Sequence, residues 1–303
     1  MHVRSGAIVV AALALVQGSA FAQQQDLSKV EVKASKVAGS IYVLTGSGGN
    51  IGVSAGPDGI LIIDDQFAPL APKIKAALKG VVDAPLRFVV NTHFHFDHTG
   101  SNEIFGKEAT IVAHENVRNR LKAGSTVFKV VSPPAPVSAL PVITFKDQVS
   151  IHFNGEEIRA VHFPRGHTDT DSVIFFTGSK VVHMGDHYFA GTFPFVDMDS
   201  GGTVAGFLAN IEKVASELPA DTKVIPGHGP VTSLADLKSW VQALKETRAA
   251  VQAGLDKGKT PDQLKKEKAL AKWNKMASPF VSADFWIDTL VRDIQAPAAG
   301  PAK

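Results

Sequence analysis

Two periods of apolar residues alternate along the chain and predict a mixture of strands and helices. Continuous apolar runs at residues 59–64 and 87–91 predict strands that are buried on both faces. Residues 69–79 carry apolar side chains at the spacing of a helix, which we expect Gly80 to end. Further strands are predicted at residues 41–45, 51–54, 110–113, 149–153, 158–163, 172–177, 180–184 and 223–225, and further helices at residues 115–122, 206–218 and 234–253.

The predicted elements follow one another without a linker, although four prolines indicate an irregular connection at residues 132–141. The Asn154-Gly155 pair between two alternating runs predicts a β-hairpin. Because strands alternate with helices, we expect an α/β fold with sheets inside and helices outside. One domain is predicted over residues 23–295, followed by a frayed tail at residues 296–303.

The first 22 residues have the organisation of a signal peptide. Arg4 provides a positive start, residues 7–16 form a short apolar segment, and Ala20-Phe21-Ala22 is a cleavage site of the A-x-A type. A membrane anchor is the alternative, but a span needs roughly 20 apolar residues. We therefore expect a mature protein that starts at Gln23, is periplasmic or secreted, and has no stable membrane insertion.

Composition restricts the chemistry more than it restricts the fold. The 303 residues include 31 Lys and Arg against 29 Asp and Glu, and this balance of +2 provides no strong field for nucleic acid. Cysteine is absent, which excludes a disulfide framework, a thiolate nucleophile and a zinc site built from cysteines. The 11 histidines are distributed unevenly, and they are the residues that point to a metal.

Four candidate metal ligands follow the predicted strand at residues 87–91. His93 and His95 are two positions apart, so their side chains point to the same side of the extended chain. Asp97 and His98 come where the chain turns, and they can face a second point nearby. Neutral imidazoles with a carboxylate and no thiolate suit zinc best, although iron or manganese is also possible.

Partners for these ligands are expected farther along the chain, because one loop cannot close two metal sites. His167, Asp186 and His228 each follow a predicted strand. Glycines beside them let the backbone approach a site closely. The sequence therefore predicts a metal centre that is held by His93, His95, Asp97, His98, His167, Asp186 and His228.

The order of these motifs resembles the signature of the metallo-β-lactamase superfamily. The motifs are H-x-H-x-D-H at residues 93–98, G-H-T at 166–168, G-D at 185–186 and P-G-H-G at 226–229. The resemblance extends from Ile41 to about Trp240. It implies a four-layer αββα sandwich in which loops from both sheets hold the metals at one edge.

The resemblance also implies a division of the ligands between two metals. The first metal would be bound by His93, His95 and His167. The second would be bound by Asp97, His98 and His228. Asp186 matches the aspartate that bridges both metals in members similar to glyoxalase II and to lactonases.

The activity that the resemblance implies is that of a secreted hydrolase with two Zn²⁺ per chain. Two metals roughly 3.5–4 Å apart would hold a bridging water and lower its pKa to about 7, and the hydroxide would attack a carbonyl. Asp97 would orient this nucleophile as well as bind metal. The expected partner is a small molecule with an ester, lactone, thioester or amide. β-Lactams are possible, although the common lactamases carry Cys or Ser at the position of Asp186.

An iron oxygenase of the same superfamily, of the persulfide dioxygenase type, is the alternative function. Such an enzyme uses one metal with two histidines and one carboxylate, and it leaves the pair Asp97 and His98 unused. The complete second set of ligands argues against it. A nucleic-acid processing enzyme of the ribonuclease Z type shares the motif, but the signal peptide and the near-neutral charge argue against that interpretation.

The remaining histidines have mainly structural interpretations. We expect His152 and His162 to face solvent, because they alternate with apolar residues on the predicted hairpin. His114 begins a predicted helix and is expected to be structural. His183 and His187 flank Asp186 closely, and one of them could orient a metal ligand.

Two carboxylates and two loops have two interpretations each. Asp64 could bond to a metal-ligating histidine or cap the loop that follows it, and Asp171 is similar. The aromatic residues 188–195 either pack a loop onto the core or form a wall of the substrate pocket. The glycine-rich turn at residues 46–50 is either a plain hairpin or a flap over the substrate.

The cleavage site can be tested directly. Because Ala20-Phe21-Ala22 is the only A-x-A sequence directly after the apolar segment, we expect the exported protein to begin at Gln23. Mass measurement of the N-terminal peptide of periplasmic protein checks this. An intact Met1 on protein recovered from the periplasm would contradict it.

Overall fold

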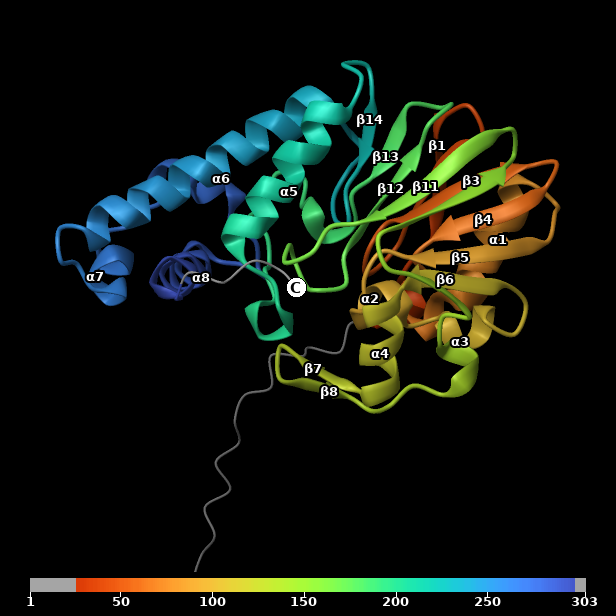
Figure 1. Ribbon diagram of the computed structural model, residues 1–303, viewed down its shortest axis with the longest axis horizontal. Coiled ribbons are helices and arrows are strands. Elements are labelled where there is room, and N and C mark those ends of the chain that lie inside the picture. Colours follow the sequence, from red (N-terminus) through yellow and green to blue (C-terminus); the bar gives the residue numbers. More distant parts are fainter. Residues whose placement is uncertain (1–25, 298–303) are drawn as a thin grey trace, which may run out of the picture.

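Two β-sheets lie face to face, with helices on the outer side of each (Figure 1). The computed structural model describes residues 26–297. The predicted signal peptide and residues 298–303 of the predicted tail lie outside the described residues. Within residues 26–297, the structure contains no helix of the length and hydropathy that a membrane span requires.

The first sheet has seven strands in the order β1-β2-β3-β4-β5-β6-β9. Their bounds are β1 (Lys33–Ala38), β2 (Ile41–Thr45), β3 (Ile51–Gly56), β4 (Gly59–Ile63), β5 (Leu86–Asn91), β6 (Thr110–His114) and β9 (Ile143–Phe145). Neighbours from β1 to β4 are antiparallel, whereas β4, β5, β6 and β9 are parallel. The parallel strands bring their carboxyl ends to one edge, where ligand sites form in such sheets.

The second sheet has six strands in the order β10-β11-β12-β13-β14-β15. Their bounds are β10 (Gln148–Phe153), β11 (Glu156–His162), β12 (Ser172–Phe176), β13 (Val181–His183), β14 (Lys223–Ile225) and β15 (Thr232–Ser233). Only β13 and β14 are parallel to each other in this sheet. A separate hairpin, β7 (Ser125–Val127) and β8 (Val130–Ser132), precedes it in the chain.

Helices cover the outer faces of both sheets. The α-helices are α1 (Ala71–Val81), α2 (Phe96–Thr99), α3 (Asn102–Phe105), α4 (Glu115–Ala123), α5 (Val204–Glu217), α6 (Leu234–Leu255), α7 (Pro261–Lys266) and α8 (Ala283–Gln295). The 3₁₀ helices are η1 (Leu27–Lys29), η2 (Ala68–Leu70), η3 (Val137–Ala139), η4 (Gly185–His187), η5 (Met198–Ser200) and η6 (Ala271–Met276). α1 and α3 pack on the first sheet, and α5, α6 and α8 pack on the second.

Alternation of side chains along the buried strands separates the core into layers. On β4, Leu61 and Ile63 point between the sheets, where they join a cluster that includes Ile174 of β12. Ile62 points to the opposite face and packs with α1. On β12, Phe175 points away from the first sheet and packs with α5 and α6. The layers are therefore helix, sheet, sheet and helix, which confirms the expected αββα sandwich.

Three features of individual elements differ from the expectations. α1 continues through Gly80 to Val81, because a Cβ atom at Gly80 would meet no other atom and the glycine is tolerated on the solvent side. The apolar pattern did not predict β1, which is the edge strand of the first sheet and is mostly exposed. β9, at the opposite edge, was also not predicted.

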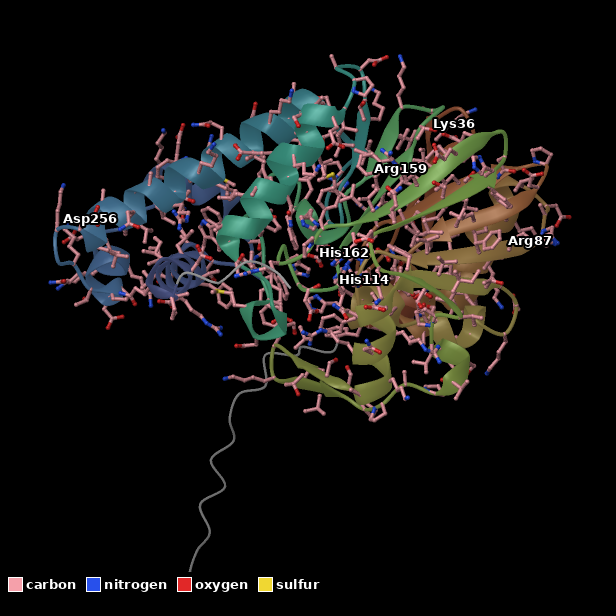
Figure 2. All side chains as sticks on the ribbon, viewed as in Figure 1. Lys36, Arg87, His114, Arg159, His162 and Asp256 are labelled. Atoms are coloured by element: carbon pink, nitrogen blue, oxygen red, sulfur yellow. The ribbon has the colours of Figure 1, made fainter. Side chains whose placement is uncertain are left out.

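A stacked pair of histidines joins the two sheets beside α4. His114 ends β6 and His162 ends β11, and their rings stack at 3.6 Å with 9° between the planes (Figure 2). Nδ1 of His114 accepts a hydrogen bond from the backbone N–H of Asn116, which makes His114 the N-cap of α4. The structural interpretation of His114 is therefore confirmed. His162 is half-buried, so the prediction that it faces solvent is wrong, whereas His152 is exposed.

This pair should make stability depend on pH. Burial, together with the neighbouring His162, lowers the pKa of His114 to about 4, and burial also lowers the pKa of His162. An unfolded chain binds protons at these histidines near a pH of about 6.5. Because the folded chain stays neutral there, the contribution of the pair to stability is lost as the pH falls from about 6.5 toward 4.

The variant His114→Asn isolates this effect, because asparagine can cap α4 but does not titrate. We expect the variant to lose less stability than the parent protein when the pH is lowered from about 7 to about 5. Urea denaturation at both pH values measures the two losses. Other titrating groups contribute equally to both proteins, so equal losses would contradict the prediction.

Candidate metal centre

Strand β5 and the short helix after it place the first four predicted ligands. β5 ends at Asn91, and His95, in extended backbone, is the N-cap of α2. Asp97 and His98 belong to the single turn of α2. The chain bends at residues 92–94, and His93 and His95 come together in one cluster, whereas the helical turn places Asp97 and His98 in another.

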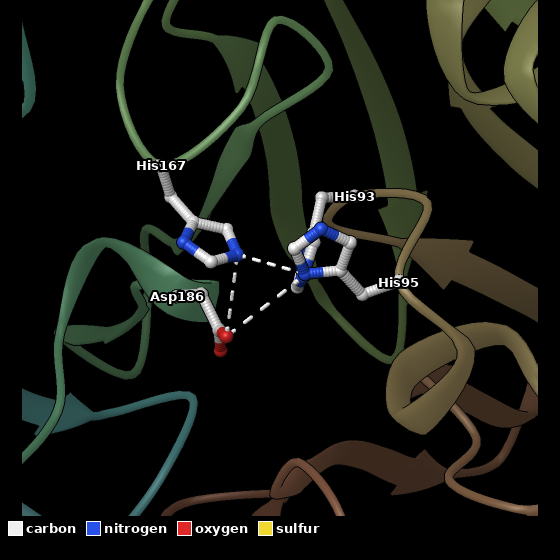
Figure 3. Close-up of side chains that lie close together, drawn as sticks. All are labelled: His93, His95, His167 and Asp186. Atoms are coloured by element: carbon white, nitrogen blue, oxygen red, sulfur yellow. Dashed lines mark hydrogen bonds and ion pairs between the residues drawn. The ribbon is translucent and has the colours of Figure 1, made fainter. Parts of the chain in front are cut away.

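The first cluster contains His93, His95, His167 and Asp186, all of them buried (Figure 3). One ring nitrogen or carboxylate oxygen from each lies within 4.8 Å of the others. Nε2 of His167 lies 3.0 Å from Nδ1 of His95 and 3.5 Å from Oδ2 of Asp186. Nε2 of His93 lies 3.8 Å from the same oxygen of Asp186.

The second cluster contains Asp97, His98 and His228. Nε2 of His98 and Nε2 of His228 are 3.4 Å apart, and Oδ2 of Asp97 lies 3.5 Å from the first and 3.4 Å from the second. The side chains of His228 and Asp97 are 31% and 20% exposed, whereas His98 is completely buried. The second cluster therefore forms the open side of the site.

Asp186 lies between the two clusters. Its Oδ2 faces His93 and His167 of the first cluster. Its Oδ1 lies 3.1 Å from Nε2 of His98 and 3.4 Å from Nε2 of His228, in the second cluster. One carboxylate thus presents one oxygen to each cluster, which is the geometry that a bridging ligand requires.

Two buried atoms at the centre of the site show that its residues fit metal ions. Within the described part of the chain, Nε2 of His93 makes no hydrogen bond, and the neighbours of Oδ1 of Asp186 are the imidazole nitrogens of His98 and His228. Buried polar atoms are nearly always bonded, so such atoms need an explanation. In addition, ring nitrogens of His95 and His167 face each other at hydrogen-bond distance. Imidazole nitrogens and carboxylate oxygens converging without a thiolate are the donor set of a zinc, iron or manganese site.

Burial and opposite charges set the protonation of these groups. Burial lowers the pKa of His167 to about 4, and burial together with His98 holds the pKa of His93 well below its usual range. Burial acts in the same direction on His98, but the nearby carboxylates, Asp186 first, raise its pKa well above the usual value. Burial would raise the pKa of Asp186, yet His228 and His98 hold it well below its usual range. Neutral His93 and His167 with ionised Asp186 are the forms that bind metal.

Asp64 contacts the predicted ligand His98 directly and the predicted ligand His93 through Thr92. Its Oδ2 lies 2.7 Å from Nδ1 of His98 and accepts a hydrogen bond from the hydroxyl of Thr92, also at 2.7 Å. The same hydroxyl lies 3.0 Å from Nδ1 of His93. The first interpretation of Asp64 is therefore confirmed, because it bonds directly to a histidine of the second cluster. Such partners fix the orientation and tautomer of metal-binding imidazoles.

The corresponding partner of the first cluster was not predicted. Oδ2 of Asp197 lies 3.1 Å from Nε2 of His95, and Nδ1 of His167 donates to the carbonyl of Phe195 at 2.8 Å. Asp197 follows the aromatic segment by only two positions, but it is 102 positions from His95. The spacing of residues in the sequence gives no signal for a contact at that distance.

Asp171, His183 and His187, the remaining polar residues considered in the sequence, belong to neither ligand cluster and contact the surrounding loops and helices. Asp171 accepts a hydrogen bond from the N–H of Thr168, the residue after His167, at 2.8 Å. His183 contacts the carbonyl of Asn50 through Nε2 at 3.1 Å. His187 stacks on Phe207 with 5° between the planes. Asp171 therefore has the loop-capping role, and the two histidines hold segments that adjoin the site.

The turn at residues 46–50 is tied to the second cluster. A Cβ atom on Gly49 would lie 2.2 Å from Cε1 of His98, so the backbone lies directly against that ring. The side-chain amide of Asn50 donates to backbone carbonyls on both sides of His228, at 2.9 and 2.8 Å. These contacts favour the interpretation as an anchored hairpin over that of a mobile flap.

The aromatic segment at residues 188–195 packs on the core, which was one of its two interpretations, and also lies against rings of both clusters. Tyr188 and Phe193 are buried in the core beneath the second sheet. Phe189 stacks on the ring of His228 at 5.2 Å with 12° between the planes. Phe195 lies 5.7 Å from the ring of His167. The segment therefore packs on the core and also adjoins both clusters.

Comparison with curated proteins finds relatives that match this chain over most of their own length. The chain is 30% identical over 186 residues to a probable metallo-hydrolase, YqgX, of Bacillus subtilis (strain 168), covering 57% of this chain and 85% of the relative. It is 31% identical over 210 residues to a hydroxyacylglutathione hydrolase of Brucella anthropi, covering 64% of this chain and 70% of that protein.

Solved structures share the fold. A metallo-beta-lactamase from Pontibacter korlensis superposes with a TM-score of 0.59 at 16% identity, covering 70% of this chain and 98% of that one. The metallo-beta-lactamase DIM-1 has a TM-score of 0.59 at 21% identity, covering 72% and 99%. The sec-alkyl sulfatase PisA1, as a double mutant, has a TM-score of 0.65 at 15% identity, covering 87% of this chain and 50% of that one.

The family model described as the metallo-beta-lactamase superfamily matches residues 35–228 of the chain. This range contains both clusters and most of the two sheets. The match agrees with the αββα layers and with a cluster of histidines and aspartates that is compatible with metal binding. The chain belongs to the metallo-beta-lactamase superfamily and is a metal-dependent hydrolase by family.

Proposed function

We propose that the protein is an exported hydrolase with two zinc ions, and that it cleaves an ester, lactone, thioester or amide of a small molecule. The position of Asp186 is the observation that carries this proposal. A carboxylate that presents one oxygen to each of two ligand clusters is suited to two cations and not to one. Export rests on the signal-peptide pattern of residues 1–22.

The chemistry that zinc supplies when bound is Lewis acidity, which polarises a carbonyl and lowers the pKa of water to about 7. The chain contributes the geometry. Asp97 is the catalytic residue that we propose: its carboxylate lies on the open side of the site, where it can accept a hydrogen bond from the attacking water. Water adds to the carbonyl carbon, the bond to the leaving oxygen, nitrogen or sulfur breaks, and an acid and a protonated leaving group are released.

The charge of the site bears on the substrate class. Asp186 adds a carboxylate between the clusters, which partly neutralises two cations and weakens their attraction for a second anion. Lys223, the nearest basic residue before His228 in the sequence, is an exposed residue of β14. The site therefore favours an uncharged ester or lactone over a substrate that carries a carboxylate.

Metal content tests the proposal most directly. Elemental analysis of the purified protein should find about two zinc ions per chain, because two clusters are present. Asp186→Ala and Asp186→Asn should both hold less zinc and lose at least ~100-fold in kcat/KM, more than the 10–100-fold typical of partners around a site. Asp199→Ala is the matched control, because that side chain is 78% exposed.

Three outcomes would contradict this prediction. About two zinc ions and nearly full turnover in both Asp186 variants would show that the carboxylate is a structural cap. One iron per chain in the parent protein would favour the persulfide dioxygenase alternative. A loss of zinc in Asp199→Ala equal to that in Asp186→Ala would show that the effect is not specific to the site.

Relative rates test the preference for neutral substrates. On one zinc-loaded preparation, we expect kcat/KM for a β-lactam such as nitrocefin to be at least tenfold below that for an uncharged lactone, because Asp186 weakens the attraction for carboxylates. Steady-state assays of both substrates decide the question. A β-lactam value near 10⁶ M⁻¹s⁻¹, about the middle of the ordinary enzyme range, with a lactone far below it, would contradict the prediction.

A further inference from the structure

The metal centre opens toward one side only. His228 and Asp97 are partly exposed, whereas His93, His95, His98, His167 and Asp186 are nearly inaccessible. A substrate must therefore approach past His228. The residues that adjoin the ring of His228 on the open side would therefore contact the part of the substrate that is not cleaved.

A cavity of about 360 Å³ adjoins His228 at that opening. Its lining residues are Gly48, Phe189, Ala190, Thr192, Phe193, His228, Gly229, Ser278 and Phe280. Among the described residues, this lining includes no lysine, arginine, aspartate or glutamate. Phe189 forms one wall of the cavity and stacks on His228. The ring of His228 is therefore the boundary between the cavity and the metal centre.

Phe280 forms the outer rim of the cavity and is unusually exposed for its size. Its side chain is 58% exposed, and its ring lies 4.5 Å from Phe128 at the tip of the β7–β8 hairpin. Phe195 lies beneath both rings, 3.9 Å from Phe128. Exposed contiguous aromatic surface on a soluble protein usually marks a place where an apolar partner binds. Ser278 and Phe280 come from the chain after residue 228, outside the range that the family model matches.

We propose that this cavity binds an uncharged hydrocarbon chain of the substrate, so that the preferred substrate is an ester or lactone with an alkyl substituent. The inference rests on the proposed hydrolase and specifies its substrate class. An apolar lining stabilises methylene groups by removing them from water, whereas a carboxylate there would find no cation to replace its hydration. Phe280 is the residue that determines specificity, because it is the aromatic rim that a longer chain must contact.

A series of lactones measures the contribution of the cavity. γ-Butyrolactone has no side chain, whereas γ-octalactone carries a butyl chain on the same ring. Each buried methylene should raise kcat/KM by up to about fourfold, so we expect γ-octalactone to be favoured by at least tenfold. Phe280→Ser should remove most of this preference, because it should lower kcat/KM for γ-octalactone at least tenfold more than kcat/KM for γ-butyrolactone.

Phe285→Ser is the matched control. Phe285 is a partly exposed phenylalanine of the same aromatic group, 6.2 Å from Phe128, but it does not line this cavity. Both variants replace exposed rings, so neither should disturb folding. The preference for γ-octalactone should therefore stay the same in Phe285→Ser as in the parent protein.

Binding of 2-nonanone, which cannot be hydrolysed, gives a second measurement that does not need turnover. Calorimetric titration of the zinc-loaded protein should show binding that Phe280→Ser weakens about tenfold and Phe285→Ser does not change. If the ketone binds in this way but no lactone, ester, thioester or amide is cleaved, the cavity is supported and the proposed reaction fails. If lactones are cleaved without regard to chain length or to Phe280→Ser, the reaction is supported and the cavity inference is overturned.

Two further outcomes would also overturn the inference. If Phe280→Ser converts a dimer to a monomer in light scattering while ketone binding stays unchanged, the aromatic rim is an interface between copies of this chain. If the parent protein binds no ketone and cleaves no lactone, ester, thioester or amide, both proposals fail together.

Discussion

The burial of Asp186 among imidazole rings is the interaction on which the rest of the site depends. A buried carboxylate is unstable unless positive charge or hydrogen-bond donors compensate for the loss of water. Here the neighbouring atoms are ring nitrogens, and Nε2 of His93 makes no hydrogen bond with the described residues. Cations would satisfy both kinds of atom. His93 follows a strand of the first sheet, and Asp186 follows a strand of the second, so metal binding would also join the two sheets.

The backbone around the site is held in place before any ligand arrives. Asp64 has a φ of 64°, a left-handed conformation that is rare for residues other than glycine. Its carboxylate accepts hydrogen bonds from the backbone N–H and the hydroxyl of Thr92 and contacts His98 as well. Asn50 makes a comparable connection across the two sheets, since its amide bonds to the loop that carries His228. A strained residue with several buried hydrogen bonds is typical of a preorganised functional site.

The features that the sequence predicted well are those with local causes. Strand β4 is an uninterrupted apolar run, and His93 and His95 share one cluster as expected, although the chain between them is bent and not extended. Asp197 could not be found in this way, because its contact with His95 depends on how the two sheets pack. For the same reason His162 was expected in solvent, although it stacks on a histidine of the other sheet. Edge strand β1 was missed because it is mostly exposed, so its sequence lacks the apolar alternation of a half-buried strand.

The structure separates the groups that would perform the reaction from those that would select the substrate. Both ligand clusters lie within the family-matched residues 35–228, whereas part of the cavity wall comes from the following segment. Contacts with Phe193 fix that segment relative to the site. The ring of Phe193 stacks on Trp286 of α8, and the backbone N–H of Phe193 donates to the carbonyl of Met276. Phe193 belongs to the loop that starts directly after Asp186 and His187. Changes in the C-terminal helices would therefore reshape the cavity while the ligands stay in place. Among the described residues, His228 is the one that both lines the cavity and belongs to a ligand cluster.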